Sequence, residues 1–173
     1  MEVQIRDFEN EILAVGEIGL DYYHERKETE RRKQKEIFKS ILDLAEEIGK
    51  PVVIHARDSE RVAYEMLKRT DLEAVFHCYS GDIKTMKSIE DSGYYISLST
   101  LVCFSEKHIK LAEKVSLEHL LLETDSPFLS PRRGRNEPAF VWDAVRKVAE
   151  IKDTSVQEIC NVVLKNINKL FKI

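Results

Sequence analysis

The sequence predicts an α/β fold in which short parallel strands alternate with helices. Apolar runs of strand length recur five times, and amphipathic stretches with helical spacing lie between them. No linker, low-complexity segment or charge block divides the 173 residues, so we expect a single domain over 1–173. Successive strand–helix units indicate a parallel sheet with right-handed crossovers, and their length suits a (β/α) barrel or a doubly wound sheet.

The five apolar runs are rich in Val, Ile, Leu and aromatic residues, mostly on both faces, as in strands buried within a parallel sheet. We expect these strands at 12–18, 51–55, 74–77, 94–98 and 119–123.

Helices are expected between and after the strands. In the first, apolar residues recur at helical spacing until Gly49 ends the helix and Pro51 opens the next strand. Thr154 and Gln157 have the spacing of a capping box at the start of the last helix. The expected helices are 28–48, 58–68, 82–92 and 105–115, followed by one around 141–148 and one around 159–163.

Composition excludes several classes of function. The formal net charge of −4 gives no global attraction to nucleic acid or to an anionic membrane, so phosphate binding must be local. No apolar run approaches the roughly 20 residues of a membrane span. Three scattered cysteines, Cys78, Cys103 and Cys160, argue against a disulfide framework and predict a cytoplasmic protein. No glycine-rich fingerprint, P-loop or serine elbow occurs, so we expect no nucleotide cofactor and no serine hydrolysis.

Four residues of types that bind metals mark the apolar runs. Glu17 lies in the first run, His55 and His77 end the second and third, and Asp125 follows the fifth. Because the carboxyl ends of parallel strands share one rim, these side chains should converge there. Carboxylates and imidazoles together suit a divalent ion such as Zn²⁺, Mn²⁺ or Mg²⁺, with Asp125 as base for an activated water.

Each of these residues alone has an ordinary explanation, such as an ion-paired carboxylate or a hydrogen-bonded core histidine, and the set of four favours a site. The other three histidines receive no role. Arg57, Arg135 and Asn136 lie in loops at the same rim and are candidates for holding a phosphate. The neighbouring Arg132 and Arg133 are as well explained by a solvated surface loop.

Five segments in order resemble the TatD family of metal-dependent deoxyribonucleases, within the amidohydrolase-like barrels. They are "GEIGLDYY" (16–23), "PVVIHARD" (51–58), "FHCYSG" (76–81), "LLETDSPFLSP" (121–131) and "RGRNEP" (133–138). The resemblance implies a TIM-barrel-like fold and Mg²⁺- or Mn²⁺-assisted hydrolysis of DNA phosphodiesters. It also implies that Glu17, His55, His77 and Asp125 bind metal, with Glu17 able to bridge two ions and Asp125 the general base.

The sequence departs from the family at its start. Members begin with a strand carrying His-x-His, and this chain contains no such motif. A whole barrel takes about 250 residues and eight strands, whereas the sequence predicts about five of eight strand–helix units. We therefore expect an N-terminally truncated domain with open sheet edges, and either a homodimer or a partner chain that covers them.

Three functions follow from this sequence. The first is an exonuclease-like deoxyribonuclease that acts on DNA ends. The second is a hydrolase of esters, lactones or amides with the same metal barrel. The third is a metal-binding remnant with weak or no turnover that assembles with a partner chain.

Overall fold

The structure is a computed structural model that describes residues 2–173. Its centre is a five-stranded sheet in which all strands are parallel and lie in the order β1-β2-β3-β4-β5. The strands are β1 (Val15–Asp21), β2 (Val52–Arg57), β3 (Ala74–Phe76), β4 (Tyr95–Leu98) and β5 (Leu120–Leu122). Because each strand pairs with its neighbour in sequence and the order never reverses, the sheet has the topology of a barrel segment rather than of a doubly wound sheet.

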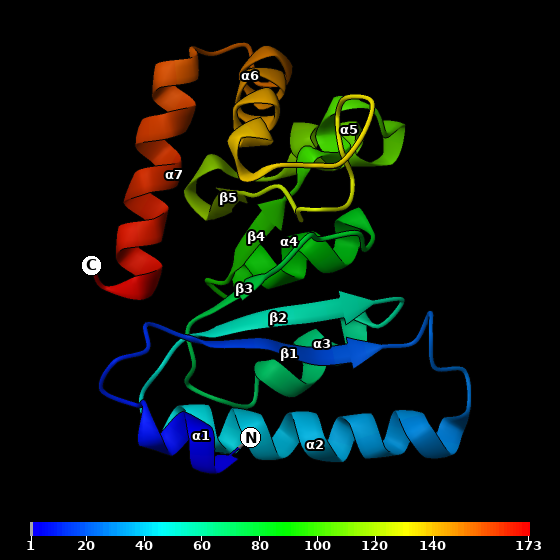
Figure 1. Ribbon diagram of the computed structural model, residues 1–173, viewed down its shortest axis with the longest axis vertical. Coiled ribbons are helices and arrows are strands. Elements are labelled where there is room, and N and C mark those ends of the chain that lie inside the picture. Colours follow the sequence, from blue (N-terminus) through cyan, green and yellow to red (C-terminus); the bar gives the residue numbers. More distant parts are fainter. Residues whose placement is uncertain (1) are drawn as a thin grey trace.

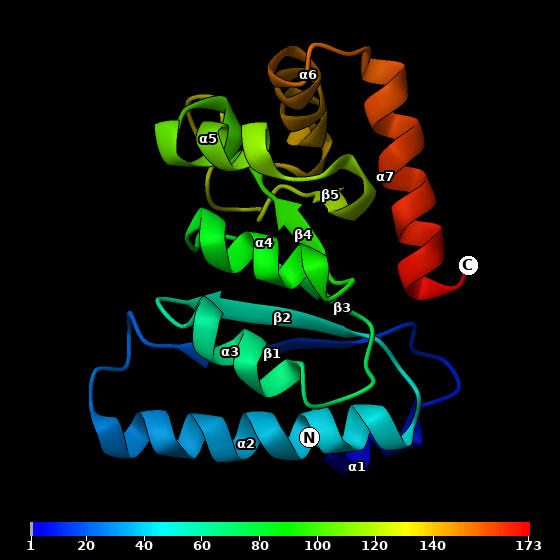
Figure 2. The same ribbon diagram turned by 180° about the vertical axis from the view of Figure 1, so that it is seen from behind.

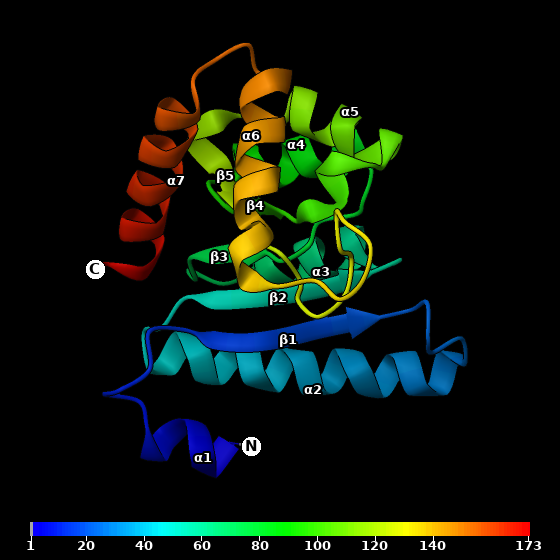
Figure 3. The same cartoon turned by 45° about the horizontal axis from the view of Figure 1, so that its top comes forward.

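Helices follow each strand and cover the sheet (Figures 1 and 2). They are α1 (Glu2–Asp7), α2 (Glu28–Glu47), α3 (Glu60–Leu67), α4 (Ile83–Asp91), α5 (Glu106–Lys114), α6 (Val141–Ile151) and α7 (Val156–Phe171). Short 3₁₀ turns occupy Thr100–Cys103, Leu117–His119 and Pro138–Phe140. The sequence did not predict α1, which lies beside α2 in Figure 3 and is joined to it by the Arg6–Glu47 ion pair. Within residues 2–173, no helix combines the length and apolar character needed to cross a membrane.

The first strand and the last helix cap differ from expectation. β1 begins at Val15 and continues to Asp21, three residues beyond the expected end. Gly19 permits this extension, because a Cβ there would lie 1.8 Å from the His55 carbonyl oxygen of β2. The cap of α7 is Ser155, whose hydroxyl accepts a hydrogen bond from the Glu158 amide, so the expected Thr154 cap is wrong by one residue.

The two faces of the sheet have different environments. On one face, residues such as Leu20, Ile54 and Phe76 join the main core together with Phe38 and Leu42 of α2. On the other face, a smaller apolar cluster packs against α7. It consists of Val53, Val75, Tyr95 and Leu121 from β2 to β5 with Val163, Ile167, Leu170 and Phe171. We call this second face the inner face.

Along the inner face, an apolar residue is followed two positions later by a polar one in four of the strands. The pairs are Val53 and His55, Val75 and His77, Tyr95 and Ser97, and Leu121 and Glu123. Because side chains alternate along a strand, each pair shares one face. The inner face is therefore apolar near the strand starts and polar at their carboxyl ends, where a site can form.

Candidate metal centre

His77 lies at the centre of the polar end of the inner face. Its Nε2 atom lies 3.6 Å from Glu17 Oε2 and 3.5 Å from Asp125 Oδ1. Its Nδ1 atom lies 2.9 Å from Glu123 Oε1 and 3.0 Å from Oε2. The imidazole is thus surrounded by three carboxylates that come from β1, from the end of β5 and from the loop that follows it.

The backbone places these side chains in specific ways. His77 follows the last residue of β3, and its amide still donates to the Ile54 carbonyl, 2.9 Å away, so the ring remains attached to the sheet. Asp125 has a left-handed φ of 57°, a conformation that Asp tolerates better than most residues. The Asn136 amide donates to the Thr124 carbonyl, 2.6 Å away, which holds the segment before Asp125.

The electrostatics of this cluster are anionic. Burial alone would lower the pKa of the His77 imidazole. The surrounding carboxylates, Glu123 first among them, outweigh that effect and raise this pKa to about 9. Burial raises the pKa of the Asp125 carboxyl, and the negative charges of Glu123 and Glu17 add to the shift. A divalent cation would relieve this crowding of negative charge.

The donor set fits such an ion in part. Oxygen and nitrogen donors bound at about 2.1 Å stand about 3.4 Å apart along a tetrahedral edge, close to the separations around His77 Nε2. Within residues 2–173, however, no three His, Cys, Asp or Glu side chains form a ready metal-binding group. Binding would therefore need a modest inward movement of these donors.

His55 is separated from the other three predicted ligands. Its Nε2 atom lies 3.4 Å from Asp21 Oδ2, and the same oxygen lies 2.7 Å from His24 Nδ1. In the part of the chain that the structure describes, no hydrogen bond or ion pair joins His55 to Glu17, His77 or Asp125. The structure therefore brings together Glu17, His77 and Asp125 and leaves His55 beside Asp21.

The family model described as TatD related DNase matches residues 3–172. The chain belongs to the TatD-related DNase family. It is 48% identical over 169 residues to MJ1582 of Methanocaldococcus jannaschii, an uncharacterized metal-dependent hydrolase, covering 97% of this chain and 66% of that protein. It is 39% identical over 173 residues to YcfH of Escherichia coli K12, also an uncharacterized metal-dependent hydrolase, covering 95% of this chain and 64% of that protein.

A solved structure supports the same assignment. YJJV, a TatD homologue from Escherichia coli K12, superposes with a TM-score of 0.90 at 26% sequence identity, over 99% of this chain and 70% of that chain. This match confirms the expected TIM-barrel-like α/β fold with five parallel strands. The chain spans about two thirds of the length of the curated relatives it matches.

The expected phosphate-binding residues have different positions in this TatD-related chain. Arg57 is exposed, and its guanidinium lies 4.0 Å from the centre of the Tyr23 ring. Arg135 is exposed in the loop after β5. Asn136 is only 2% exposed, and its amide donates to the Thr124 and Phe128 carbonyls, with Thr100 Oγ1 also 3.1 Å from the amide nitrogen. Direct contact between Asn136 and a substrate is therefore inconsistent with the structure, in which this side chain holds the loop.

Three polar residues at this rim received no role from the sequence, namely Ser97, Asp21 and Glu123, although Glu123 was expected at the end of the fifth strand. Ser97 and Glu123 contact each other and Glu123 contacts His77, whereas Asp21 contacts His55. The apolar–polar pairing along β4 and β5 was the available signal for Ser97 and Glu123.

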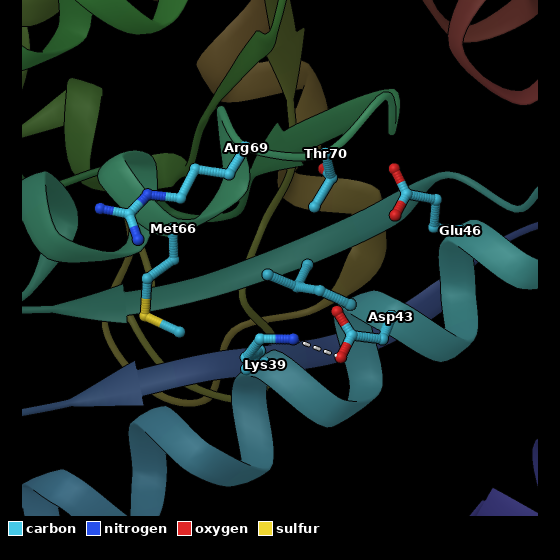
Figure 4. Close-up of a pocket in the computed structure, with 7 residues that line it drawn as sticks. Lys39, Asp43, Glu46, Met66, Arg69 and Thr70 are labelled. Atoms are coloured by element: carbon cyan, nitrogen blue, oxygen red, sulfur yellow. Dashed lines mark hydrogen bonds and ion pairs between the residues drawn. The ribbon is translucent and has the colours of Figure 1, made fainter.

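A surface crevice of about 150 Å³ lies away from this centre, where α2 faces the end of α3 (Figure 4). Three of its four charged side chains, those of Lys39, Asp43 and Glu46, have partners within the protein. Lys39 and Asp43 form an ion pair at 2.5 Å, and Glu46 accepts from the Asp71 amide at 2.7 Å. The remaining lining residues are Leu42, Met66, Arg69 and Thr70. The crevice adds no group to the metal centre.

Proposed function

We propose that this chain is a metal-dependent hydrolase that cleaves phosphodiester bonds in DNA, acting at DNA ends. The observation that carries the proposal is the approach of Glu17 and Asp125 to the Nε2 atom of His77. Family membership supports DNA as the substrate class, while MJ1582 and YcfH are named only as metal-dependent hydrolases.

Each residue has a defined role in the proposal. When bound, Mg²⁺, Mn²⁺ or Zn²⁺ would activate a water molecule and stabilise charge on the phosphoryl oxygens. Glu17, His77 and His55 would supply donors to the ion, with His55 exchanging its contact with Asp21 for the ion. Asp125 accepts the proton of the attacking water, a role that its raised pKa favours. Arg57 and Arg135 bind the substrate phosphates.

The test is cleavage of a single-stranded DNA oligonucleotide with Mg²⁺ or Mn²⁺, comparing wild type with Asp125→Asn. Loss of a general base typically costs about 10²–10⁴-fold in rate, so we expect a loss of at least about 100-fold. Asp153→Asn is the matched control, because Asp153 also has a left-handed φ, 49°, but lies exposed between α6 and α7. Equal rates for Asp125→Asn and wild type would overturn the proposal.

Hydrolysis of an ester, lactone or amide by the same centre is the nearest alternative. Two exposed arginines, Arg57 and Arg135, favour a phosphate instead. A panel that sets a phosphodiester against a carboxylic ester, a lactone and an amide separates the two. A preference for any of the last three would favour the alternative.

A second candidate is a metal-binding chain that acts only within an assembly. Two observations favour it: the donor group around His77 is incomplete within residues 2–173, and β1 and β5 each pair with one strand only. We propose that a second copy or a partner chain covers these edges. Sedimentation across a range of concentrations tests for the homodimer, and full turnover by a monomer would remove the candidate.

The three free cysteines support the proposal that the protein works in the cytoplasm.

A further inference from the structure

Glu123 lies on the opposite side of the imidazole from the predicted metal ligands. Its amide donates to the Leu98 carbonyl at 3.1 Å, which continues the pairing of β5 with β4 by one residue. Its side chain is only 20% exposed, and both oxygens lie within 3.0 Å of His77 Nδ1. Glu17 and Asp125 instead approach Nε2. The two ring nitrogens therefore have separate partners.

Ser97 extends this arrangement to β4. Its hydroxyl lies 2.5 Å from Glu123 Oε2, and the residue is 4% exposed. An ionised carboxylate can only accept hydrogen bonds, so the Ser97 hydroxyl donates to it. Ser97, Glu123 and His77 thus form one chain of hydrogen bonds that crosses β4, the end of β5 and the end of β3.

This chain selects the protonation pattern of the ring. When a cation displaces a proton from the ring, the neutral imidazole that remains carries one N–H. Glu123 lies within hydrogen-bond distance of Nδ1, whereas the carboxylates near Nε2 are 3.5 and 3.6 Å away, so Nδ1 keeps the proton. An acceptor at Nδ1 therefore leaves the lone pair on Nε2, the atom that approaches Glu17 and Asp125. Hydrogen bonds of this kind orient metal-binding histidines and raise their basicity.

We propose that Ser97 and Glu123 are positioning residues that hold His77 in its Nδ1–H form, so that Nε2 is the nitrogen that binds the cation. The inference rests on the proposed metal centre and is independent of the identity of the substrate. Its test therefore measures metal binding and the state of the ring, and DNA cleavage plays no part.

The first measurement is calorimetric titration of the 173-residue chain with Zn²⁺. Glu123→Ala removes the acceptor, and we expect about 10–100-fold weaker binding, the usual cost of losing such a partner. Glu123→Gln keeps a neutral acceptor and should recover part of the loss. Ser97→Ala should weaken binding in the wild-type background and have no further effect in Glu123→Ala, because Ser97 acts through Glu123.

Ser99→Ala is the matched control. Ser99 is equally buried at the end of β4. Its hydroxyl accepts hydrogen bonds from the Cys78 thiol and the Leu101 amide and, within residues 2–173, forms none with Glu123. A loss for Ser99→Ala as large as that for Ser97→Ala would show that general disturbance of the strand end is responsible. Any of three results would overturn the proposal: this equal loss for Ser99→Ala, additive losses of affinity in the Ser97→Ala, Glu123→Ala double variant, or unchanged Zn²⁺ affinity in Glu123→Ala.

The second measurement needs no destabilising variant. Long-range proton–nitrogen NMR spectra of the Zn²⁺-loaded, ¹⁵N-histidine-labelled protein report the tautomer of each ring, with His77→Gln used only to assign its signals. We expect His77 to show Nδ1–H with the ion on Nε2. A proton on Nε2, with the ion on Nδ1, would refute the assignment even if every variant bound metal weakly.

Discussion

Acidification should destabilise the protein through His108, a histidine outside the metal centre. His108 is 6% exposed, its Nε2 atom lies 2.9 Å from Ser80 Oγ, and its Nδ1 atom lies 2.8 Å from Ser105 Oγ. Burial, with a smaller contribution from the charge of Lys107, lowers the pKa of His108 from 6.5 to about 4. Ser80 belongs to the segment just after His77, so this histidine holds α5 against the segment that leaves the metal centre.

The sign and size of the effect follow from proton linkage. Between pH 6.5 and 4 the unfolded chain binds a proton at His108 that the folded chain does not, so the free energy of unfolding falls as the pH falls. The contribution is present above pH 6.5. The full shift corresponds to about 3 kcal/mol, of which about 2 kcal/mol is lost by pH 5.

Urea unfolding at pH 8 and pH 5 measures this loss in wild type and in His108→Gln. His77, whose pKa is raised, has the opposite dependence: its stabilisation is fully present below pH 6.5 and is lost as the pH rises through 9. The difference between wild type and His108→Gln cancels this and other common contributions. We expect the variant to lose about 2 kcal/mol less than wild type between the two pH values. Equal losses, or NMR titration of folded His108 near pH 6.5, would refute the reasoning.

Three other perturbations have defined outcomes. Asn136→Ala removes the amide that contacts Thr100 and two carbonyls, so the free energy of unfolding in urea should fall by about 2–3 kcal/mol. A fall below about 0.5 kcal/mol would show that the loop keeps its position without this amide. Gly19→Ala places a methyl group against the His55 carbonyl at a φ of 151°, so thermal unfolding should show a fall of more than about 3 kcal/mol in the free energy of unfolding. A wild-type melting temperature would contradict the register of β1. Arg57→Ala should raise KM for a DNA oligonucleotide several-fold with little change in kcat, because an exposed phosphate contact contributes equally in the ground and transition states. An unchanged KM would remove Arg57 from the proposed substrate site.

Sequence periodicity predicted the helices and strands whose formation depends mainly on their own residues. The alternation of apolar runs and amphipathic stretches predicted the five parallel strands and the helices α2 to α7. The convergence of Glu17, His77 and Asp125 also followed from the sequence, since parallel strands end at one rim whatever the details of their packing. The end of β1 was misplaced because it depends on Gly19 fitting against β2, a contact between residues 36 positions apart.

The sequence did not allow us to predict the direction in which individual side chains point. Asn136 is a polar residue in an arginine-rich loop, a pattern equally compatible with an exposed ligand contact and with a buried clamp. Its burial is determined by Thr100 and by carbonyls of a loop that folds back on itself. The pairing of Glu123 with His77 likewise joins residues 46 positions apart, and the choice between its roles as metal ligand and as partner of Nδ1 depends on the strand register.

The distribution of charge at the centre limits how a DNA substrate could bind. Three carboxylates surround His77, and the chain as a whole carries a formal charge of −4, so a phosphodiester would meet repulsion from both. The arginines offset this only at the periphery: Arg57 stacks on Tyr23, and Arg132 is already bound to Asp143 through two hydrogen bonds. In the proposed mechanism, a cation at His77 Nε2 would therefore attract the substrate as well as activate water. This dual requirement would give the half-buried His77 imidazole a reason to be held by two further side chains, Glu123 and Ser97, as proposed above.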